Sequence, residues 1–328
     1  MKGLIVLTQG ENKGKMKFTR RQFLKIFSSS AAAAAITSSY NPVIVKALTG
    51  SGVDKPAVIW LQGAGCNGCS ISLLNTVHPK IAEVLIQIIN LEYHPTLMAG
   101  TGKTAFDHIQ ETAQKFKGKF ILILEGGVPT AENGLYCTIG ERNGQPITLV
   151  EAVQNLVPDA GVLMAVGTCA AFGGIPSAKP NPTQVKSLAE VSGKIDKPVI
   201  NISGCPTHPD WVVGTIVHVL NFGIPELLKD GRPAMFYKEN IHENCTNYSF
   251  FANAEFASEY GQPGCLAELG CKGPVAYADC SLRRWNNGVN WCIGSGTGCI
   301  ACCEAEFPDN GVSLYAKLPK HKIPKAKT

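Results

Sequence analysis

The chain has 328 residues, of which 45% are hydrophobic and 17% are charged, so it is long enough for two folded domains and too apolar for a disordered protein. Its formal net charge is +5, but residues 1–47 carry eight lysines and arginines against one acid, so the remainder is slightly acidic. The charge therefore gives no argument for nucleic-acid binding. Thirteen cysteines are present, and an odd number would leave one thiol over in a scheme of disulfides alone.

Residues 1–47 have the pattern of a twin-arginine signal peptide. Arg20 and Arg21 stand in the segment Thr-Arg-Arg-Gln-Phe-Leu-Lys, an apolar stretch follows over 26–40, and Val45-Lys46-Ala47 offers a cleavage site. The alternative is an amphipathic helix with a chance arginine pair. The pattern predicts export to the periplasm or to the exported face of the cytoplasmic membrane, and the start, Met1 or Met16, stays open.

The next part of the chain, 53–225, alternates apolar strands with helical segments. We expect strands at 57–61, 120–124, 162–166 and 199–202, and helices at 70–90, 104–117, 147–156 and 211–222. Continuous apolar strands alternating with amphipathic helices indicate an α/β domain, with a parallel sheet and helices on both of its faces.

Cysteines follow three of these strands. Cys66 and Cys69 come after the first, Cys169 after the strand at 162–166, and Cys205 after the strand at 199–202, each within two residues of a glycine. The carboxyl ends of parallel strands share one edge of the sheet, so these four thiols are expected to converge. Four thiolates suit a cubane iron–sulfur cluster or a zinc ion. Each cysteine alone could be a buried apolar residue, and the first pair alone could be a redox motif.

The segment 232–312 loses the alternation and gains cysteine. Seven cysteines and six glycines lie from Cys265 to Cys303, with Gly264 directly before them, and few apolar residues remain to form a core. Two sets of four ligands are possible. They are His242, Cys245, Cys265 and Cys271, and then Cys280, Cys292, Cys299 and Cys302.

Disulfides, zinc and iron–sulfur clusters all remain possible from the spacing of these residues. The signal peptide favours clusters, because twin-arginine export carries proteins that fold in the cytoplasm, where thiols stay reduced. The basic tail 313–328 is expected to be solvated, and after cleavage of the leader no apolar run is long enough to anchor the mature chain in a membrane.

Several spaced motifs resemble one family. They are Cys66-Asn67-Gly68-Cys69, Glu125-Gly126-Gly127-Val128-Pro129-Thr130, Gly167-Thr168-Cys169, Gly204-Cys205-Pro206, His242-Glu243-Asn244-Cys245, Glu268-Leu269-Gly270-Cys271-Lys272-Gly273-Pro274 and Cys299-Ile300-Ala301-Cys302. Over 58–308 the chain closely resembles the small, electron-transferring subunit of nickel–iron hydrogenases. The resemblance implies a flavodoxin-like doubly wound parallel sheet over 53–225, followed by a smaller, loop-rich iron–sulfur domain over 232–312. An iron–sulfur subunit of respiratory complex I shares the first domain but lacks a second cluster-bearing domain.

The resemblance also implies three clusters in a line. The ligands would be Cys66, Cys69, Cys169 and Cys205 for a proximal 4Fe–4S cluster, Cys280, Cys292, Cys299 and Cys302 for a medial cluster, and His242, Cys245, Cys265 and Cys271 for a distal 4Fe–4S cluster. Cys292 stands where many members have proline, which indicates the nickel–iron–selenium branch and a 4Fe–4S medial cluster. Without Cys292 as a ligand that cluster would be 3Fe–4S. Cys137 and Cys303 match no ligand position.

The function that the resemblance implies is passage of electrons from hydrogen oxidation to an external acceptor. A large subunit would carry the bimetallic site, and a multihaem c-type cytochrome or a membrane quinone-linked subunit would accept the electrons. Gly68 and Gly174 stand where oxygen-tolerant members have two further cysteines, so an ordinary proximal cluster is expected. The alternative is an exported binding protein stabilised by zinc or disulfides.

Overall fold

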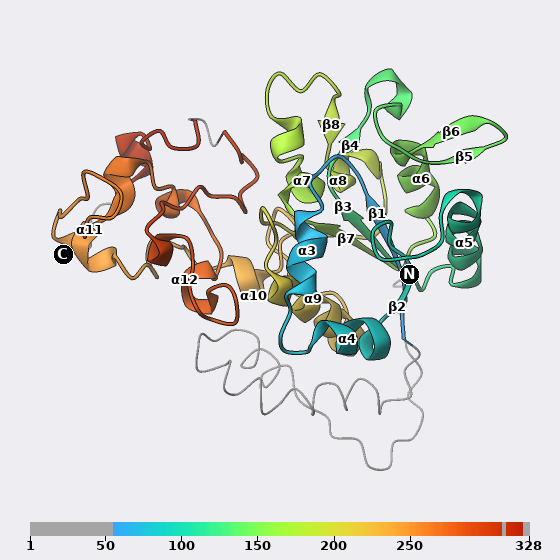
Figure 1. The fold of residues 1–328 in the computed structure, drawn as a ribbon, viewed down its shortest axis with the longest axis horizontal. Helices are drawn as coiled ribbons and strands as arrows, with labels where there is room; N and C mark the ends of the chain where they lie inside the picture. Colours follow the sequence, from blue (N-terminus) through green and yellow to red (C-terminus); the bar gives the residue numbers. More distant parts are fainter. Residues whose placement is uncertain (1–54, 310–312, 324–328) are drawn as a thin grey trace, which may run out of the picture.

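The computed structural model describes residues 55–309 and 313–323 (Figure 1). The predicted signal peptide and the last residues of the basic tail lie outside this part of the chain. No helix among the described residues combines the length and the apolar character needed to cross a membrane.

A five-stranded parallel sheet forms the centre of the first region (Figure 1). Its strands are β1 (Ala57–Gln62), β2 (Asn90–Tyr93), β3 (Ile121–Glu125), β7 (Val162–Val166) and β9 (Val199–Ile202). The order across the sheet is β2-β1-β3-β7-β9, which is the flavodoxin-like order. The predicted fold class is therefore confirmed.

Helices cover both faces of the sheet, as predicted. Successive strand residues point to opposite faces, so Val58 and Trp60 join one apolar layer and Ile59 and Leu61 join the other. The first layer packs against α9 (Pro209–Phe222), and the second against α5 (Gly102–Lys115) and α6 (Leu149–Leu156). Every residue of β3 is buried, which explains the apolar run over its first four residues, 121–124.

The single helix expected over 70–90 is wrong. The structure has α3 (Gly68–Leu74), α4 (Ile81–Glu83) and a π-helix η1 (Val84–Ile88), and Asn90 already belongs to β2. Pro79 interrupts the helix between α3 and α4, because proline lacks an N–H and disfavours helical backbone in the residue before it.

The helix expected over 147–156 also begins later than predicted. Gln145–Thr148 forms β6, which pairs with β5 (Thr138–Arg142) as a hairpin. The side chain of Thr148 then caps α6 by accepting the N–H of Glu151 at 3.3 Å. The remaining elements here are β4 (Val128–Pro129), β8 (Val185–Lys186), η2 (Ala131–Gly134), η3 (Ile175–Ser177), α7 (Thr168–Phe172) and α8 (Leu188–Val191).

The C-terminal region is built from loops and short helices and lies beside the sheet domain (Figure 1). Its helices are α10 (Ala234–Tyr237), α11 (Tyr248–Ala252), η4 (Leu266–Leu269), η5 (Gly273–Val275), α12 (Cys280–Arg283), η6 (Ile293–Ser295) and η7 (Lys320–Lys322). Trp291 and Ile293 of this region belong to the same buried apolar cluster as Trp211 of α9, so the two regions share one core.

The described part of the basic tail packs on the C-terminal region. Leu318 is buried, the ammonium of buried Lys272 donates to the carbonyl of Ala316 at 2.6 Å, and Lys317 pairs with Glu268. A buried ammonium needs such acceptors. The expectation of a solvated tail is therefore wrong for Leu318, although Lys317, Lys320 and His321 are exposed.

Candidate metal-cluster sites

The structure brings the first predicted set of thiols together at the carboxyl edge of the sheet. Cys66 and Cys69 follow β1, with Cys69 in α3, while Cys169 lies in α7 after β7 and Cys205 follows β9. The loops approach very closely here. Gly167 has φ +89, and a Cβ at this position would lie 2.5 Å from the sulfur of Cys69, so only glycine fits.

Burial and mutual repulsion shift the pKa values of these thiols. Burial raises the pKa of Cys169 to about 12, and repulsion from Cys205 contributes in the same direction. Burial also raises the pKa of Cys69 well above its ordinary value, followed by the charge of Glu125. Such thiols ionise only beside a cation, so the set fits a metal cluster that supplies positive charge.

Glu125 is a buried residue of this site to which the sequence analysis gave no role. It ends β3, and its carboxylate accepts the backbone N–H groups of Cys69 and Ser70 at 3.0 Å each and the indole N–H of Trp60 at 3.1 Å. The carboxylate thus fixes the start of α3, where Cys69 lies. An acid directly after a fully apolar strand was the signal that could have found it.

The second set, Cys280, Cys292, Cys299 and Cys302, lies in the C-terminal region. Cys280 begins α12, Cys292 precedes η6, and the other two lie in the loop that follows. Burial raises the pKa of Cys302 to about 12, with Cys292 and Cys205 as the neighbouring thiols that add to it. Burial raises the pKa of Cys280 still more clearly, and Cys302 contributes to that rise.

The third set is His242, Cys245, Cys265 and Cys271. Burial raises the pKa of Cys245 to about 11, and Cys271 and Cys265 contribute through repulsion. The backbone N–H of Asn247 donates to the sulfur of Cys245 at 3.3 Å. Such N–H bonds to sulfur are typical around iron–sulfur ligands.

The imidazole of His242 is held in the form that a metal ligand requires. Its Nε2 is buried and has no hydrogen-bond partner. Burial lowers its pKa, so the ring is neutral, and it packs edge-on against Phe251 with ring centres 4.4 Å apart. A buried ring nitrogen without a partner costs free energy unless something binds it. His242 therefore fits a ligand better than it fits an ordinary core histidine.

Contacts between neighbouring sets place the three sets in a row. Cys205, in the first set, lies close enough to Cys302, in the second, for its backbone to lower the pKa of that thiol and for its charge to raise it. The N–H of Cys299, in the second set, donates to the sulfur of Cys271 in the third at 3.3 Å. The second set therefore lies between the other two.

All thirteen cysteines are free thiols. Cys303 is buried in the shared core, and half-buried Cys137 packs against the apolar layer of α5 and α6. Across residues 55–309 and 313–323, no three His, Cys, Asp or Glu side chains come close enough to hold a single metal ion. In a cubane, by contrast, each thiolate binds its own iron.

The fold and the sites together define a class. A flavodoxin-like sheet with thiols at its carboxyl edge, followed by a cysteine-rich region, is the arrangement of an iron–sulfur protein with more than one cluster site. The profile of the family described as NADH ubiquinone oxidoreductase, 20 Kd subunit, matches residues 66–219. The profile for the C-terminal part of the NiFe/NiFeSe hydrogenase small subunit matches residues 237–315.

Comparison with individual proteins identifies the family. The chain is 48% identical over 314 residues to the periplasmic [NiFeSe] hydrogenase small subunit of Desulfomicrobium baculatum, covering 92% of this chain and 99% of that relative. It matches a chain of the solved structure of the reduced, active Ni-Fe-Se hydrogenase from the same organism at TM-score 0.78 and 50% identity, covering 81% of this chain and all of the other. A chain of the [NiFeSe] hydrogenase of Desulfovibrio vulgaris Hildenborough matches at TM-score 0.77 and 45% identity, covering 80% and 98%.

The chain therefore belongs to the family of NiFe and NiFeSe hydrogenase small subunits, as its motifs predicted. Members of this family are iron–sulfur proteins, so the alternative of a zinc- or disulfide-stabilised binding protein is not supported.

Proposed function

We propose that this chain is the electron-transfer subunit of an exported hydrogenase and carries electrons from a partner large subunit to an external acceptor. The observation that carries the proposal is the row of three ligand sets, in which each set lies beside the next. Bound in these sets, iron–sulfur clusters would take up and release single electrons. The chain's own work is to hold them in fixed positions, buried from water.

The proposed assignment of ligands rests on the family resemblance and is supported by the order of the three sets in the chain's fold. The proximal 4Fe–4S cluster takes Cys66, Cys69, Cys169 and Cys205; the medial 4Fe–4S cluster takes Cys280, Cys292, Cys299 and Cys302; the distal 4Fe–4S cluster takes His242, Cys245, Cys265 and Cys271. The neutral imidazole of His242 replaces a charged thiolate, so it raises the reduction potential of the distal cluster. Electrons thereby have a favourable last site before they leave the chain.

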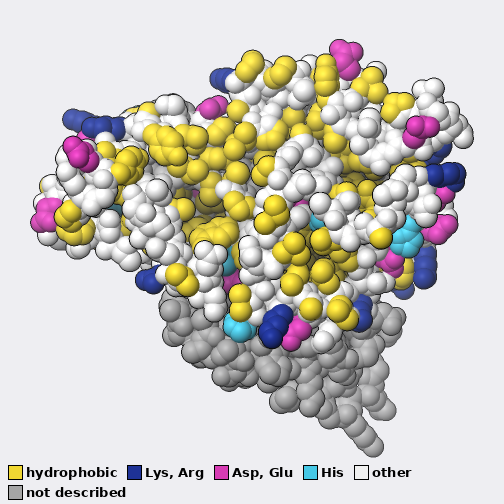
Figure 2. All heavy atoms as spheres, viewed as in Figure 1, with side chains coloured by type: hydrophobic (Ala, Val, Ile, Leu, Met, Phe, Trp, Pro, Cys, Tyr) yellow, Lys and Arg dark blue, Asp and Glu magenta, His cyan; other side chains and the backbone are white. Residues whose placement is uncertain are grey.

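The large subunit is proposed to cover the proximal set. Cys66 is exposed, and large apolar side chains near the same loops are exposed as well. Ile71 of α3 is 58% exposed and Ile175 of η3 is 53% exposed. Figure 2 shows apolar side chains gathered over the middle of this face of the molecule. Exposed apolar surface of this kind is typical of a protein–protein interface.

The remaining proposals rest on the resemblance and on the sequence. The enzyme acts in the periplasm or on the exported face of the cytoplasmic membrane, after twin-arginine export. Its acceptor is a multihaem c-type cytochrome or a membrane quinone-linked subunit. The glycines at 68 and 174 support an ordinary proximal cluster, because a Cβ at Gly174 would lie 2.9 Å from the backbone nitrogen of Cys169.

Iron and acid-labile sulfide in the anaerobically purified complex test the ligand assignment. The wild-type chain should hold about twelve iron atoms and about twelve sulfides, four for each cluster, in addition to the metals of the large subunit. Iron-free, folded, exported protein would contradict the proposal, and so would about eight iron atoms.

The medial cluster has its own test. Cys292→Pro should lower the iron content of the chain to about eleven and raise the medial potential, because a negatively charged ligand and its iron are lost. Cys303→Ser is the matched control, since its thiol lies in the same region outside every proposed set, and it should keep about twelve iron atoms. Unchanged iron in Cys292→Pro would remove Cys292 from the ligands.

A further inference from the structure

A buried hydroxyl connects the loops of the first and second thiol sets. Thr168 opens α7, directly before Cys169, and its side chain is 1% exposed. Its Oγ1 accepts the backbone N–H of Gly204 at 2.8 Å and donates to the backbone carbonyl of Cys302. Gly204 directly precedes Cys205. The Thr168 hydroxyl therefore bonds to the residue before Cys205 of the first set and to the main chain of Cys302 of the second set. Thr168 itself directly precedes Cys169 of the first set.

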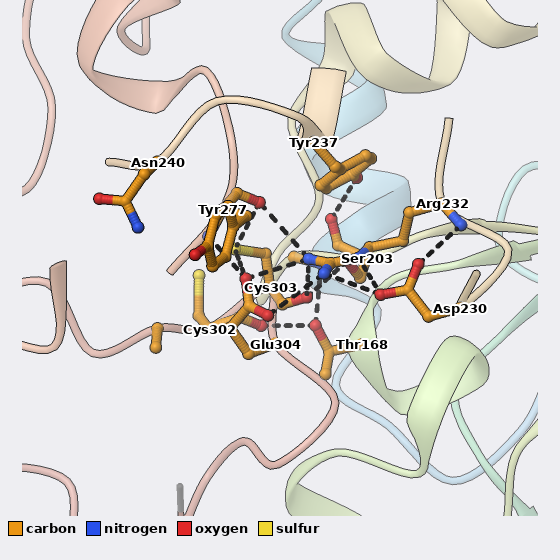
Figure 3. Close-up of polar contacts among 12 residues, drawn as sticks. Thr168, Ser203, Asp230, Arg232, Tyr237, Asn240, Tyr277, Cys302, Cys303 and Glu304 are labelled. Carbon is orange, nitrogen blue, oxygen red and sulfur yellow. Dashed lines mark hydrogen bonds and ion pairs between the residues drawn. The ribbon is translucent and has the colours of Figure 1, made fainter. Parts of the chain in front are cut away.

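The backbone carbonyl of Cys303, the residue after Cys302, also accepts hydrogen bonds from side chains (Figure 3). The hydroxyl of Ser203 donates to the carbonyl of Cys303 at 2.7 Å, and the guanidinium of Arg232 donates to the same oxygen at 3.2 Å. Arg232 is nearly fully buried and pairs with Asp230 at 2.8 Å and with Glu304 at 3.0 Å. Donors from the first region and from the segment after it thus fix two consecutive carbonyls of the loop 299–304.

The loop depends on these side chains. Residues 299–304 belong to no named helix or strand, so few backbone partners hold them in place. Thr168 suits this task because a β-branched side chain has a restricted χ1 angle, and its hydroxyl uses both its donor and an acceptor site. Loss of the hydroxyl would leave the buried N–H of Gly204 and the part-buried carbonyl of Cys302 without this partner.

We propose that Thr168 is a positioning residue that fixes the medial thiol set against the proximal set and so fixes the distance that electrons cross between them. This inference rests on the proposed assignment of Cys169 and Cys205 to the proximal set and of Cys302 to the medial set. Small displacements matter in such a relay, because the rate of electron transfer between two centres falls steeply with the distance between them.

The experiment compares Thr168→Val with Thr168→Ser in the complete enzyme, large subunit included. Valine keeps the shape and removes the hydroxyl, whereas serine keeps the hydroxyl. The first readout is amide hydrogen exchange by mass spectrometry. Exchange of peptides covering 199–207 and 299–304 should rise about tenfold in Thr168→Val and stay near wild type in Thr168→Ser.

The second readout separates the relay from the hydrogen-splitting site. Thr168→Val should oxidise hydrogen with a dye acceptor about tenfold more slowly, and exchange of D2 with solvent protons should stay at the wild-type rate because it needs no electron to leave. Thr215→Val is the matched control, since this buried threonine donates only within α9, to the carbonyl of Trp211 at 2.7 Å. It should leave both peptides and both rates unchanged.

Wild-type exchange and wild-type hydrogen oxidation in an iron-replete Thr168→Val enzyme would overturn the inference. Equal losses in Thr215→Val would also overturn it, because they would indicate general destabilisation. If Thr168→Val does not assemble, Thr168→Ala decides, because it removes the hydroxyl without placing a methyl group against the Cys302 carbonyl, and unchanged exchange of the 299–304 peptide in that variant would overturn the inference. An iron-free wild-type protein would instead contradict the proposed function.

Discussion

The two cysteine-bearing regions of this molecule hold their thiols in different ways. In the first, the cysteines follow strands of a parallel sheet whose two apolar layers are completely buried. In the second, the described helices between residues 239 and 309 are at most five residues long, and a separate buried cluster there contains only Phe251, Cys265 and Ala267.

This difference indicates which set of ligands can assemble before its metal binds. Because burial of apolar surface is the main driving force of folding, we expect the sheet to order without iron and the proximal thiols to meet at its edge. The second region has little regular structure, and two of the three ligand sets lie within it. Metal binding contributes folding free energy directly in such small, loop-rich regions. We therefore expect the first region to be a scaffold and the second to depend on its clusters.

Removal of iron is the strongest test of this comparison. After anaerobic chelation, peptides from 239–309 should lose nearly all protection from hydrogen exchange, whereas peptides covering β1, β3 and β7 keep theirs. Hydrogen-exchange mass spectrometry of the holo and apo enzyme measures both regions in one experiment. Equal loss in the two regions, or protection of both, would break the comparison.

Glu125→Gln tests how much the Glu125 carboxylate stabilises the edge of the sheet where the proximal thiols lie. The amide of glutamine presents an N–H₂ group where one carboxylate oxygen accepts hydrogen bonds, so one of the donors around Glu125 meets another donor. We expect the free energy of unfolding to fall by about 2–3 kcal/mol, as for the loss of a charged, buried acceptor.

Chemical denaturation followed by circular dichroism measures this change. The matched control is Glu151→Gln at a position in the first turn of α6 that is not buried, for which a change within about 0.5 kcal/mol is expected. A loss confined to the C-terminal region would show that Glu125 does not stabilise the sheet edge.

His94 gives the smallest expected effect and a pH dependence. It is 1% exposed, its Nδ1 accepts the N–H of Thr96 at 3.2 Å, and its Nε2 lies 3.0 Å from the hydroxyl of Ser70. Burial lowers its pKa from 6.5 to about 4. A proton on Nδ1 would face the N–H of Thr96, so the folded chain keeps the ring neutral.

The sign of the pH effect follows from the lowered pKa. Above pH 6.5 His94 is neutral in both the folded and the unfolded chain, so its full contribution to stability is present. As the pH falls towards 4 this contribution is lost, because His94 binds a proton in the unfolded chain before it does so in the folded chain. Between pH 7 and pH 5 the loss should be about 2 kcal/mol. His94→Gln should remove this difference in denaturation curves at the two pH values. An unchanged pH dependence in the variant would assign the effect to other groups.

The sequence by itself determined the class of fold and the identity of the family. The apolar strands at 162–166 and 199–202 have the predicted bounds, because a strand buried on both faces has an unbroken apolar sequence that other elements of its length lack. The rule that carboxyl ends of parallel strands meet then predicted that Cys169 and Cys205 converge, and the structure places them together.

Only the tertiary structure decided which groups connect the sites. The bonds of Thr168 to Cys302 and of the Cys299 N–H to Cys271 join residues 134 and 28 positions apart, and no local pattern encodes such pairings. The hydrogen bonds of buried Glu125 to Trp60, Cys69 and Ser70 and the packing of Leu318 likewise depend on neighbours that are distant in the chain. Periodicity and motif spacing report local backbone and ligand chemistry, whereas the relative placement of the two regions follows from packing and hydrogen bonds that form only in the folded chain.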